Sequence, residues 1–209
     1  MKRRFKKFKS NTNLANIINE NNVLIFMVFC LLTGLLAGVL LFKLKNTNGI
    51  FYKSEFAKYI TDCKKSISGV FFSCLLQILP YIAVTFIAGT SMVGSVIAPL
   101  VIAVRGADLG FVMGYLYEHF GLNGIIFNLL IIIPSAALTS IALILSGREA
   151  FGFSLSLLRL AVPESKSVML DNDFKLYSMR QLFMLLIYLL GIVLETLMTV
   201  SFLPFFKFT

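Results

Sequence analysis

Three ionisable side chains lie inside long apolar runs of this sequence. At such positions a charged side chain can take part in the transfer of ions or protons. Arg105 and Asp108 are three positions apart after a long uncharged run, and Glu195 stands alone in the last apolar stretch. A charge near the centre of a bilayer costs about 2.5–3.5 kcal/mol on insertion scales, so these residues are candidates for a transport or coupling pathway. Arg105 and Asp108 are also neighbours on a helix surface, where they can pair locally or anchor the helix at headgroup depth. The sequence leaves both interpretations open.

Catalytic and metal-binding residue sets are absent from the sequence. His119 is the only histidine, which excludes an HExxH zinc site, and there is no GxSxG motif, no P-loop and no clustered carboxylate pair. Cys30, Cys63 and Cys74 lack CxxC spacing, which favours small buried side chains over disulfides or a structural metal site. We therefore expect a protein that is not an enzyme and that needs no cofactor and no metal.

The apolar runs are long enough to cross a bilayer. Hydrophobic residues make up 58% of the 209 residues and the mean hydropathy is +0.87, well above the range of soluble domains. Uncharged runs cover residues 23–42, 66–104 and 120–147, and residues 181–206 contain only Glu195. Crossing about 30 Å of hydrocarbon takes roughly 20 residues, so the chain has at least four spans.

The run at residues 66–104 predicts one span more, because it is too long for a single helix. We place a tight reversal at residues 89–94, after which the next helix continues through Arg105 and Asp108. The predicted fold is an all-α, polytopic membrane protein with about five transmembrane helices. The expected spans are residues 22–42, 69–89, 95–117, 123–146 and 181–204. Whether the 95–117 span is complete or re-entrant stays open.

Basic residues predict the orientation of the chain. The net charge is +9, which in a soluble protein would suggest nucleic acid. With five spans and a cytoplasmic N-terminus, 11 Lys and Arg residues lie inside and 7 lie outside. Membrane topology therefore accounts for the charge, and we expect no nucleic-acid partner. We interpret residues 1–21 as a basic cytoplasmic tail and residues 22–206 as a single helical membrane domain.

Two hydrophilic segments connect the predicted spans. Residues 52–68 have apolar side chains at three- and four-residue steps, which predicts a short amphipathic exterior helix. That helix lies in the lipid interface or covers a partner. Residues 148–180 are expected to be cytoplasmic, with a helical face that ends before Pro163 and an exposed loop after it.

Glycines at four-residue spacing predict close helix contacts. Gly106, Gly110 and Gly114 form two overlapping GxxxG motifs, and Gly34 and Gly38 form another in the first span. Small residues let helix backbones approach closely, which is a main source of helix attraction in lipid. We expect these faces to contact a helix of the same chain or of a different subunit, so a homo-oligomer stays open.

The third and fourth predicted spans share one glycine-rich motif. Its residues are, in order, Arg105, Gly106, Leu109, Gly110, Phe111, Gly114, Gly121, Gly124 and Pro134. This order resembles the stage II sporulation protein M family of endospore-forming bacteria. The layout of a basic start, one span, a short hydrophilic stretch and four more spans is also similar to that family.

The resemblance implies a scaffold of the bacterial cell (inner) membrane that carries out no chemistry itself. Its implied partners are membrane lipid and the stage II sporulation proteins D and P, enzymes that remodel peptidoglycan at the sporulation septum during engulfment. The alternative from the residues is a permease subunit of an ABC-type transporter. Arg105, Asp108 and Glu195 would then line a polar path, and an ATPase would dock on residues 148–180.

Overall fold

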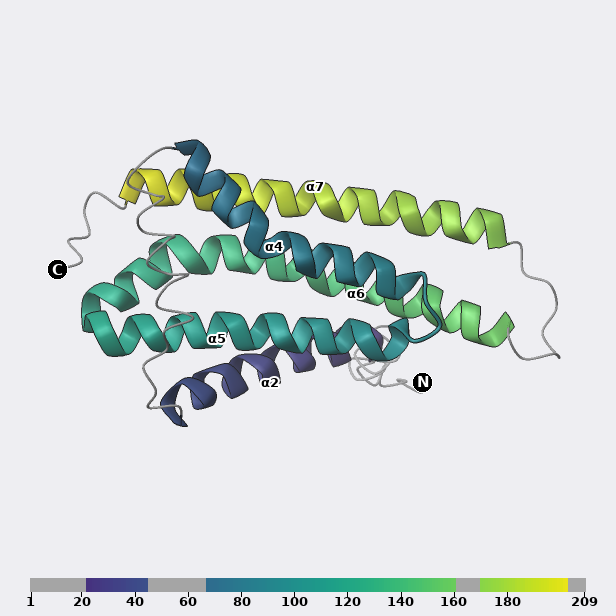
Figure 1. Cartoon of the computed structure of the whole chain (residues 1–209), viewed down its shortest axis with the longest axis horizontal. Coiled ribbons are helices and arrows are strands. Elements are labelled where there is room, and N and C mark those ends of the chain that lie inside the picture. The colour runs from purple at the N-terminus through teal and green to yellow at the C-terminus, as the bar shows by residue number, and fades with distance from the viewer. Residues whose placement is uncertain (1–21, 45–66, 161–169, 203–209) are drawn as a thin grey trace, which may run out of the picture.

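The computed structural model describes residues 22–44, 67–160 and 170–202. These residues are helical except for the turn at residues 90–93. The elements are α2 (Asn22–Leu44), α4 (Ile67–Gly89), α5 (Gly94–Phe127), the π-helix η1 (Asn128–Ile132), α6 (Ile133–Leu160) and α7 (Leu170–Phe202) (Figure 1). The predicted cytoplasmic tail, most of the exterior amphipathic segment and residues 203–209 lie outside the described residues.

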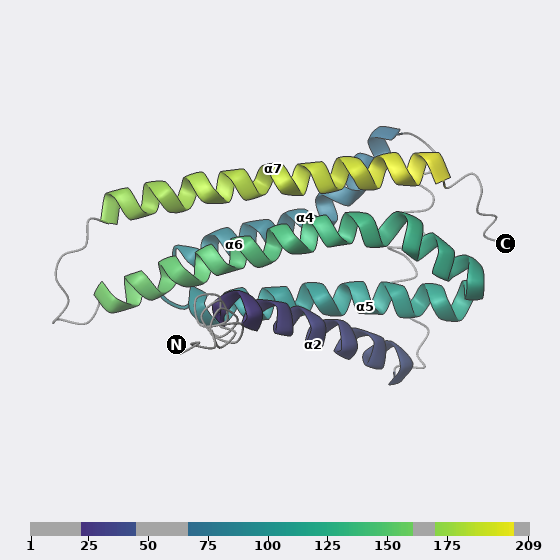
Figure 2. The same ribbon diagram turned by 180° about the vertical axis from the view of Figure 1, so that it is seen from behind.

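Four stretches of the described residues are long and apolar enough to cross a membrane. They are Asn22–Leu44, Ile67–Gly89, Gly94–Leu158 and Phe174–Phe202. The third has 65 residues because α5, η1 and α6 follow one another without a loop. Figures 1 and 2 show this stretch folding back on itself, so that α6 runs antiparallel to α5. The sequence places two separate spans here, and the structure has one continuous helical stretch with a sharp bend.

Gly121 makes that bend possible. Its φ of 53° and ψ of −128° fall in a region that side chains with a Cβ rarely adopt. The chain returns so closely that a Cβ added at Gly124 would overlap the carbonyl oxygen of Leu116. The π-helix that follows ends just before Pro134, which has no N–H to donate to the carbonyl four residues earlier.

The helices alternate in direction through the bundle. The start of α2, the 90–93 turn, the end of α6 and the start of α7 lie toward one end, and the Gly121 bend lies at the other (Figure 1). We call these the turn end and the bend end. As a result α2 and α5 run in the same direction, side by side, although α4 separates them in the sequence (Figures 1 and 2).

Helices α6 and α7 extend beyond the spans predicted for them. The sequence ends one span at 146 and starts the next at 181, whereas α6 continues to Leu160 and α7 already begins at Leu170. The helical face predicted before Pro163 is therefore confirmed as the end of α6, whereas the segment predicted as a loop after it is helical again from Leu170. Two charged residues of the 148–180 segment form an ion pair, in which Arg180 Nη1 lies 2.6 Å from Glu149 Oε2. The two extensions also stack, with ring centroids of Phe153 and Tyr177 4.8 Å apart.

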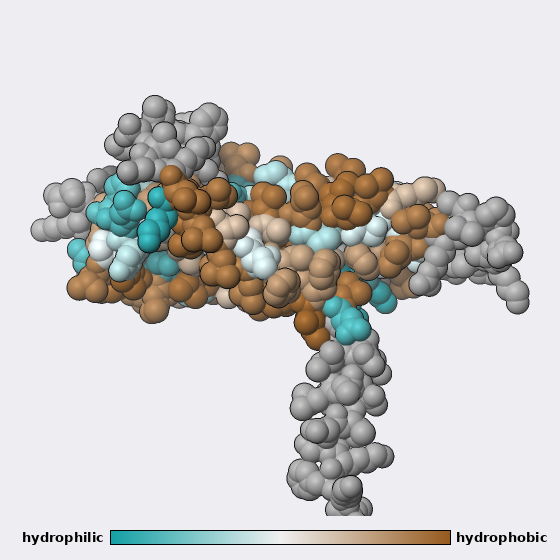
Figure 3. Space-filling view, turned by 90° about the horizontal axis from the view of Figure 1, so that it is seen from below, coloured by the Kyte–Doolittle hydropathy of each residue, from teal (hydrophilic) through white to brown (hydrophobic). Residues whose placement is uncertain are grey.

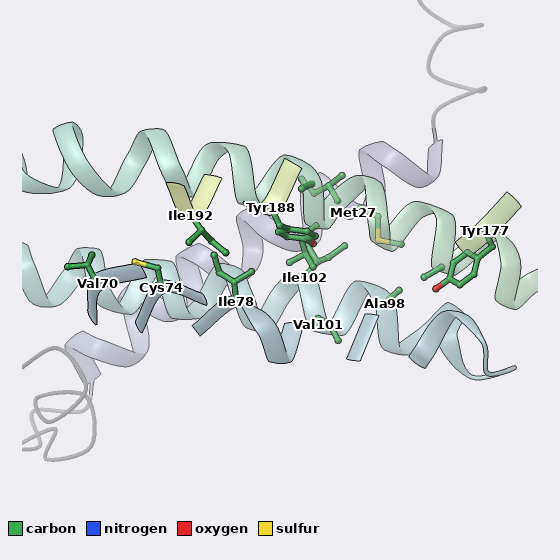
Figure 4. Close-up of a cluster of buried hydrophobic side chains, with 14 residues drawn as sticks. Met27, Val70, Cys74, Ile78, Ala98, Val101, Ile102, Tyr177, Tyr188 and Ile192 are labelled. Carbon is green, nitrogen blue, oxygen red and sulfur yellow. The ribbon is translucent and has the colours of Figure 1, made fainter. Parts of the chain in front are cut away.

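A buried apolar cluster joins all five α-helices. Its largest members include Met27 of α2, Val70 of α4, Ile102 of α5, Leu143 of α6 and Tyr188 of α7 (Figure 4). On the outside, most large exposed side chains of the described residues are also apolar. Figure 3 shows this apolar surface along the molecule, with hydrophilic residues gathered near the bend end. An apolar exterior of this kind is suited to contact with lipid.

We predict that Gly121→Ala lowers the free energy of unfolding in detergent by about 1–3 kcal/mol, because alanine is strained at this φ and ψ. The control is Gly152→Ala, since Gly152 is an exposed helical glycine with nothing within 4 Å of an added Cβ. That variant should be equally stable or more stable by up to about 1 kcal/mol. Equal stability of the two variants in an SDS titration would contradict the assigned bend.

Candidate functional site

The glycines of α2 lie directly against the backbone of α5. A Cβ added at Gly34 would overlap the carbonyl of Ala103, and one added at Gly38 would overlap the carbonyl of Ala107. Both glycines are buried. Because these obstacles are backbone atoms, they cannot move aside as a flexible side chain can. Only glycine therefore fits at these two positions with the helices at their present distance.

The glycines of α5 return the same contact to α2. A Cβ at Gly106 would overlap the carbonyl of Leu31, and one at Gly110 would overlap the carbonyl of Leu35. Gly114, the last of the motif, is more loosely packed, because an added Cβ would lie 3.1 Å from Cδ1 of the Phe42 ring. The contacts advance together along both helices, as expected for a parallel pair. We call this α2–α5 contact the glycine seam.

The seam brings together all five glycines singled out from the sequence. Of the two partners the motif left open, a helix of the same chain or of another subunit, the structure places a helix of the same chain against them. These glycines are therefore committed to the internal fold. A recruited protein would have to contact a different surface.

Arg105 and Asp108 lie beside α4, and one tyrosine contacts both of them. The hydroxyl of Tyr81 donates a hydrogen bond to Oδ2 of Asp108. The guanidinium carbon of Arg105 lies 5.4 Å from the centroid of the Tyr81 ring, within the range of a cation–π contact. All three side chains are partly buried. The charged pair is thereby fastened to the neighbouring helix.

A second polar contact joins α6 to α7. The Ser146 hydroxyl donates to Oε1 of Gln181 at 2.6 Å, and Nε2 of Gln181 donates to the Ser146 carbonyl at 3.0 Å. Both residues are buried. Tyr188, two turns further along α7, is 2% exposed and lies near Arg105 of α5 and Ser146 of α6. We call Tyr81, Arg105, Asp108, Ser146, Gln181 and Tyr188 the polar layer.

Glu195 lies on α7 further toward the bend end than Tyr188. Gly191, one turn before it, packs against α6, where an added Cβ would lie 2.7 Å from Cγ2 of Thr139. The Glu195 side chain is partly buried and interacts with other groups, as do Arg105 and Asp108. The three intramembrane charges therefore do not sit at a single level of the bundle.

Four members of the polar layer were not singled out from the sequence: Tyr81, Ser146, Gln181 and Tyr188. A usable signal was present for the tyrosines, because Tyr81 and Tyr188 lie in the middle of apolar runs instead of at their ends. A buried tyrosine hydroxyl needs a hydrogen-bond partner, so a tyrosine within a span indicates a polar neighbour. Which neighbour it contacts depends on helix register, which the sequence does not reveal.

We predict that Gly110→Ala destabilises the protein by about 1–3 kcal/mol, because the added methyl group forces α2 and α5 apart. Gly114→Ala is the matched control in the same motif. It should have a clearly smaller effect, since the Phe42 ring can shift by a few tenths of an ångström. Thermal unfolding of both variants in detergent measures the difference. A more harmful Gly114 variant would be inconsistent with the seam.

We predict that Tyr81→Phe lowers the free energy of unfolding by about 1.5–3 kcal/mol, because Asp108 loses a hydrogen bond while the ring beneath Arg105 is kept. Asp108→Asn is the comparison. Its amide oxygen can still accept the hydrogen bond from Tyr81, so this variant should lower the free energy of unfolding by less. Chemical unfolding in detergent gives both values. Tyr117→Phe, which alters an exposed hydroxyl, should have no effect.

Comparison of the chain with protein-family models, with curated proteins and with solved structures found no match.

Proposed function

We propose that this chain is a non-enzymatic integral membrane scaffold. In this proposal it anchors and recruits peptidoglycan-remodelling enzymes at the septal membrane during engulfment in endospore formation. The resemblance of the Arg105–Pro134 motif and of the overall layout to the stage II sporulation protein M family supports the proposal. The implied partners are the stage II sporulation proteins D and P.

One structural observation carries the scaffold interpretation: the intramembrane charges Arg105 and Asp108 join helices. Asp108 accepts a hydrogen bond from Tyr81, and Arg105 lies over the same ring. Together with the glycine seam, these contacts fasten α2, α4 and α5 to one another. Such an arrangement suits a rigid platform in the membrane better than a pathway that must open and close.

The proposal includes a topology of five crossings with a cytoplasmic N-terminus in the cell membrane. The alternating directions of α2, α4, α5, α6 and α7 support five crossings, with the Gly121 bend as the connection between the third and the fourth. The bend end then faces outward, where peptidoglycan lies. Its exposed polar residues Glu118, His119 and Asn123 are the surface we assign to partner contact.

A second candidate is a permease subunit of an ABC-type transporter. The observation that favours it is the π-helix η1, which interrupts regular α-helical geometry in the fourth crossing and ends two residues before Pro134. Broken helices near the membrane midplane commonly form the binding sites of transporters. The extended ends of α6 and α7 would then receive the ATPase. A gene for a P-loop ATPase beside this one would favour this candidate.

The experiment is deletion of the gene in its endospore-forming host, followed by microscopy of sporulating cells. We expect the mother-cell membrane to stall at engulfment, and the wild-type gene to restore it. A strain in which Glu118, His119 and Asn123 are all replaced by alanine should insert normally but lose co-purification with the two enzymes. Replacement of Lys175, an exposed residue toward the turn end, by alanine is the control. Normal engulfment in the deletion strain would overturn the scaffold proposal.

A further inference from the structure

The turn between α4 and α5 satisfies most, but not all, of the first N–H groups of α5. Those of Gly94, Val96 and Ile97 donate to carbonyl oxygens inside the turn. Val93, the residue before the helix, makes no side-chain hydrogen bond that caps it. The first N–H groups of a helix have no partner within the helix itself. The N–H of Ser95 therefore needs an acceptor from elsewhere in the protein.

Ser154 of α6 supplies that acceptor. Its hydroxyl oxygen accepts a hydrogen bond from the Ser95 N–H at 3.0 Å, and the hydroxyl donates to the Met92 carbonyl at 3.1 Å. The Ser154 side chain is fully buried. An N-cap side chain normally accepts from the second or third N–H group of its own helix, and Ser95 is the second residue of α5. Ser154 thus acts as an N-cap from a neighbouring helix.

Tyr177 of α7 holds the other side of the same turn. Its hydroxyl donates to the carbonyl oxygen of Phe86, in the last turn of α4, at 3.0 Å, and a Cβ added at Gly89 would overlap that hydroxyl. The Tyr177 ring stacks on Phe153 of α6, with ring centroids 4.8 Å apart and planes 11° apart. Gln181, one turn later on α7, also lies near the Tyr177 hydroxyl. Both sides of the α4–α5 turn are therefore fixed by residues of α6 and α7.

We propose that Ser154 and Tyr177 form a clasp that couples the α4–α5 turn to the ends of α6 and α7. Figure 1 shows both of these helices continuing past the turn. Movement of their ends relative to α4 and α5 removes the partners of the turn and loosens it. A protein that binds the ends of α6 and α7 thereby acts on α4 and α5, the two helices that carry Tyr81, Arg105 and Asp108.

The first test measures amide hydrogen exchange over residues 90–97 in the full chain, in lipid nanodiscs. Ser154→Ala should speed exchange at Ser95 about fivefold, the factor that corresponds to losing about 1 kcal/mol of N-cap stabilisation. Tyr177→Phe removes the other hydroxyl of the clasp and should speed exchange in the same segment. Ser156→Ala should leave it unchanged, because the Ser156 hydroxyl donates within α6. Wild-type exchange at Ser95 in Ser154→Ala would overturn the clasp.

The second test moves the ends of α6 and α7 without changing the clasp itself. Glu149 of α6 and Arg180 of α7 form an ion pair, and Glu149→Arg converts it into two like charges that repel. Exchange at Ser95 should become about two- to fivefold faster, the range expected for a partly exposed pair. Adding Arg180→Glu restores an ion pair and should restore the wild-type rate. Wild-type exchange in Glu149→Arg, or faster exchange that Arg180→Glu does not reverse, would contradict the coupling.

Discussion

The absence of a hydrophobic force between helices in lipid is the constraint on which this structure depends. Apolar side chains are as well accommodated by lipid tails as by another helix, so association requires close packing or hydrogen bonds. The chain meets this requirement in two ways. The glycine seam brings the backbones of α2 and α5 into contact, and side chains of the polar layer join α4 to α5 and α6 to α7.

These two devices use opposite kinds of residue for the same purpose. The seam forms because Gly34, Gly38, Gly106 and Gly110 have no side chain. The resulting contact is extensive and consists of van der Waals packing between the two backbones. The polar layer instead uses few groups, each of which is costly to bury and therefore must find its partner. The layer thus selects one register of the helices, whereas packing alone would tolerate several.

The sequence was sufficient to predict helices that can cross a membrane and the tight turn after Gly89, because both follow from uninterrupted apolar runs and local turn chemistry. It also singled out the glycines, whose four-residue spacing indicates a close contact. It predicted a helical face before Pro163 but not that this face continues the preceding span as one helix, and it did not predict the early start of α7. Hydropathy alone ends both helices where charges begin, but Arg180 and Glu149 pair between them. The roles of Tyr81 and Tyr188 depend on tertiary register, which no local pattern contains.

The parallel packing of α2 and α5 has a consequence for biosynthesis. Gly34 and Gly106 are about 70 residues apart, and ribosomes extend a chain at about 5–20 residues per second. Helix α2 is therefore present for roughly 4–14 s before α5 has been synthesised, and α4 is synthesised in that interval. During that interval its glycine ridge faces lipid or the insertion machinery, and the nascent chain is most exposed to pairing with the wrong helix.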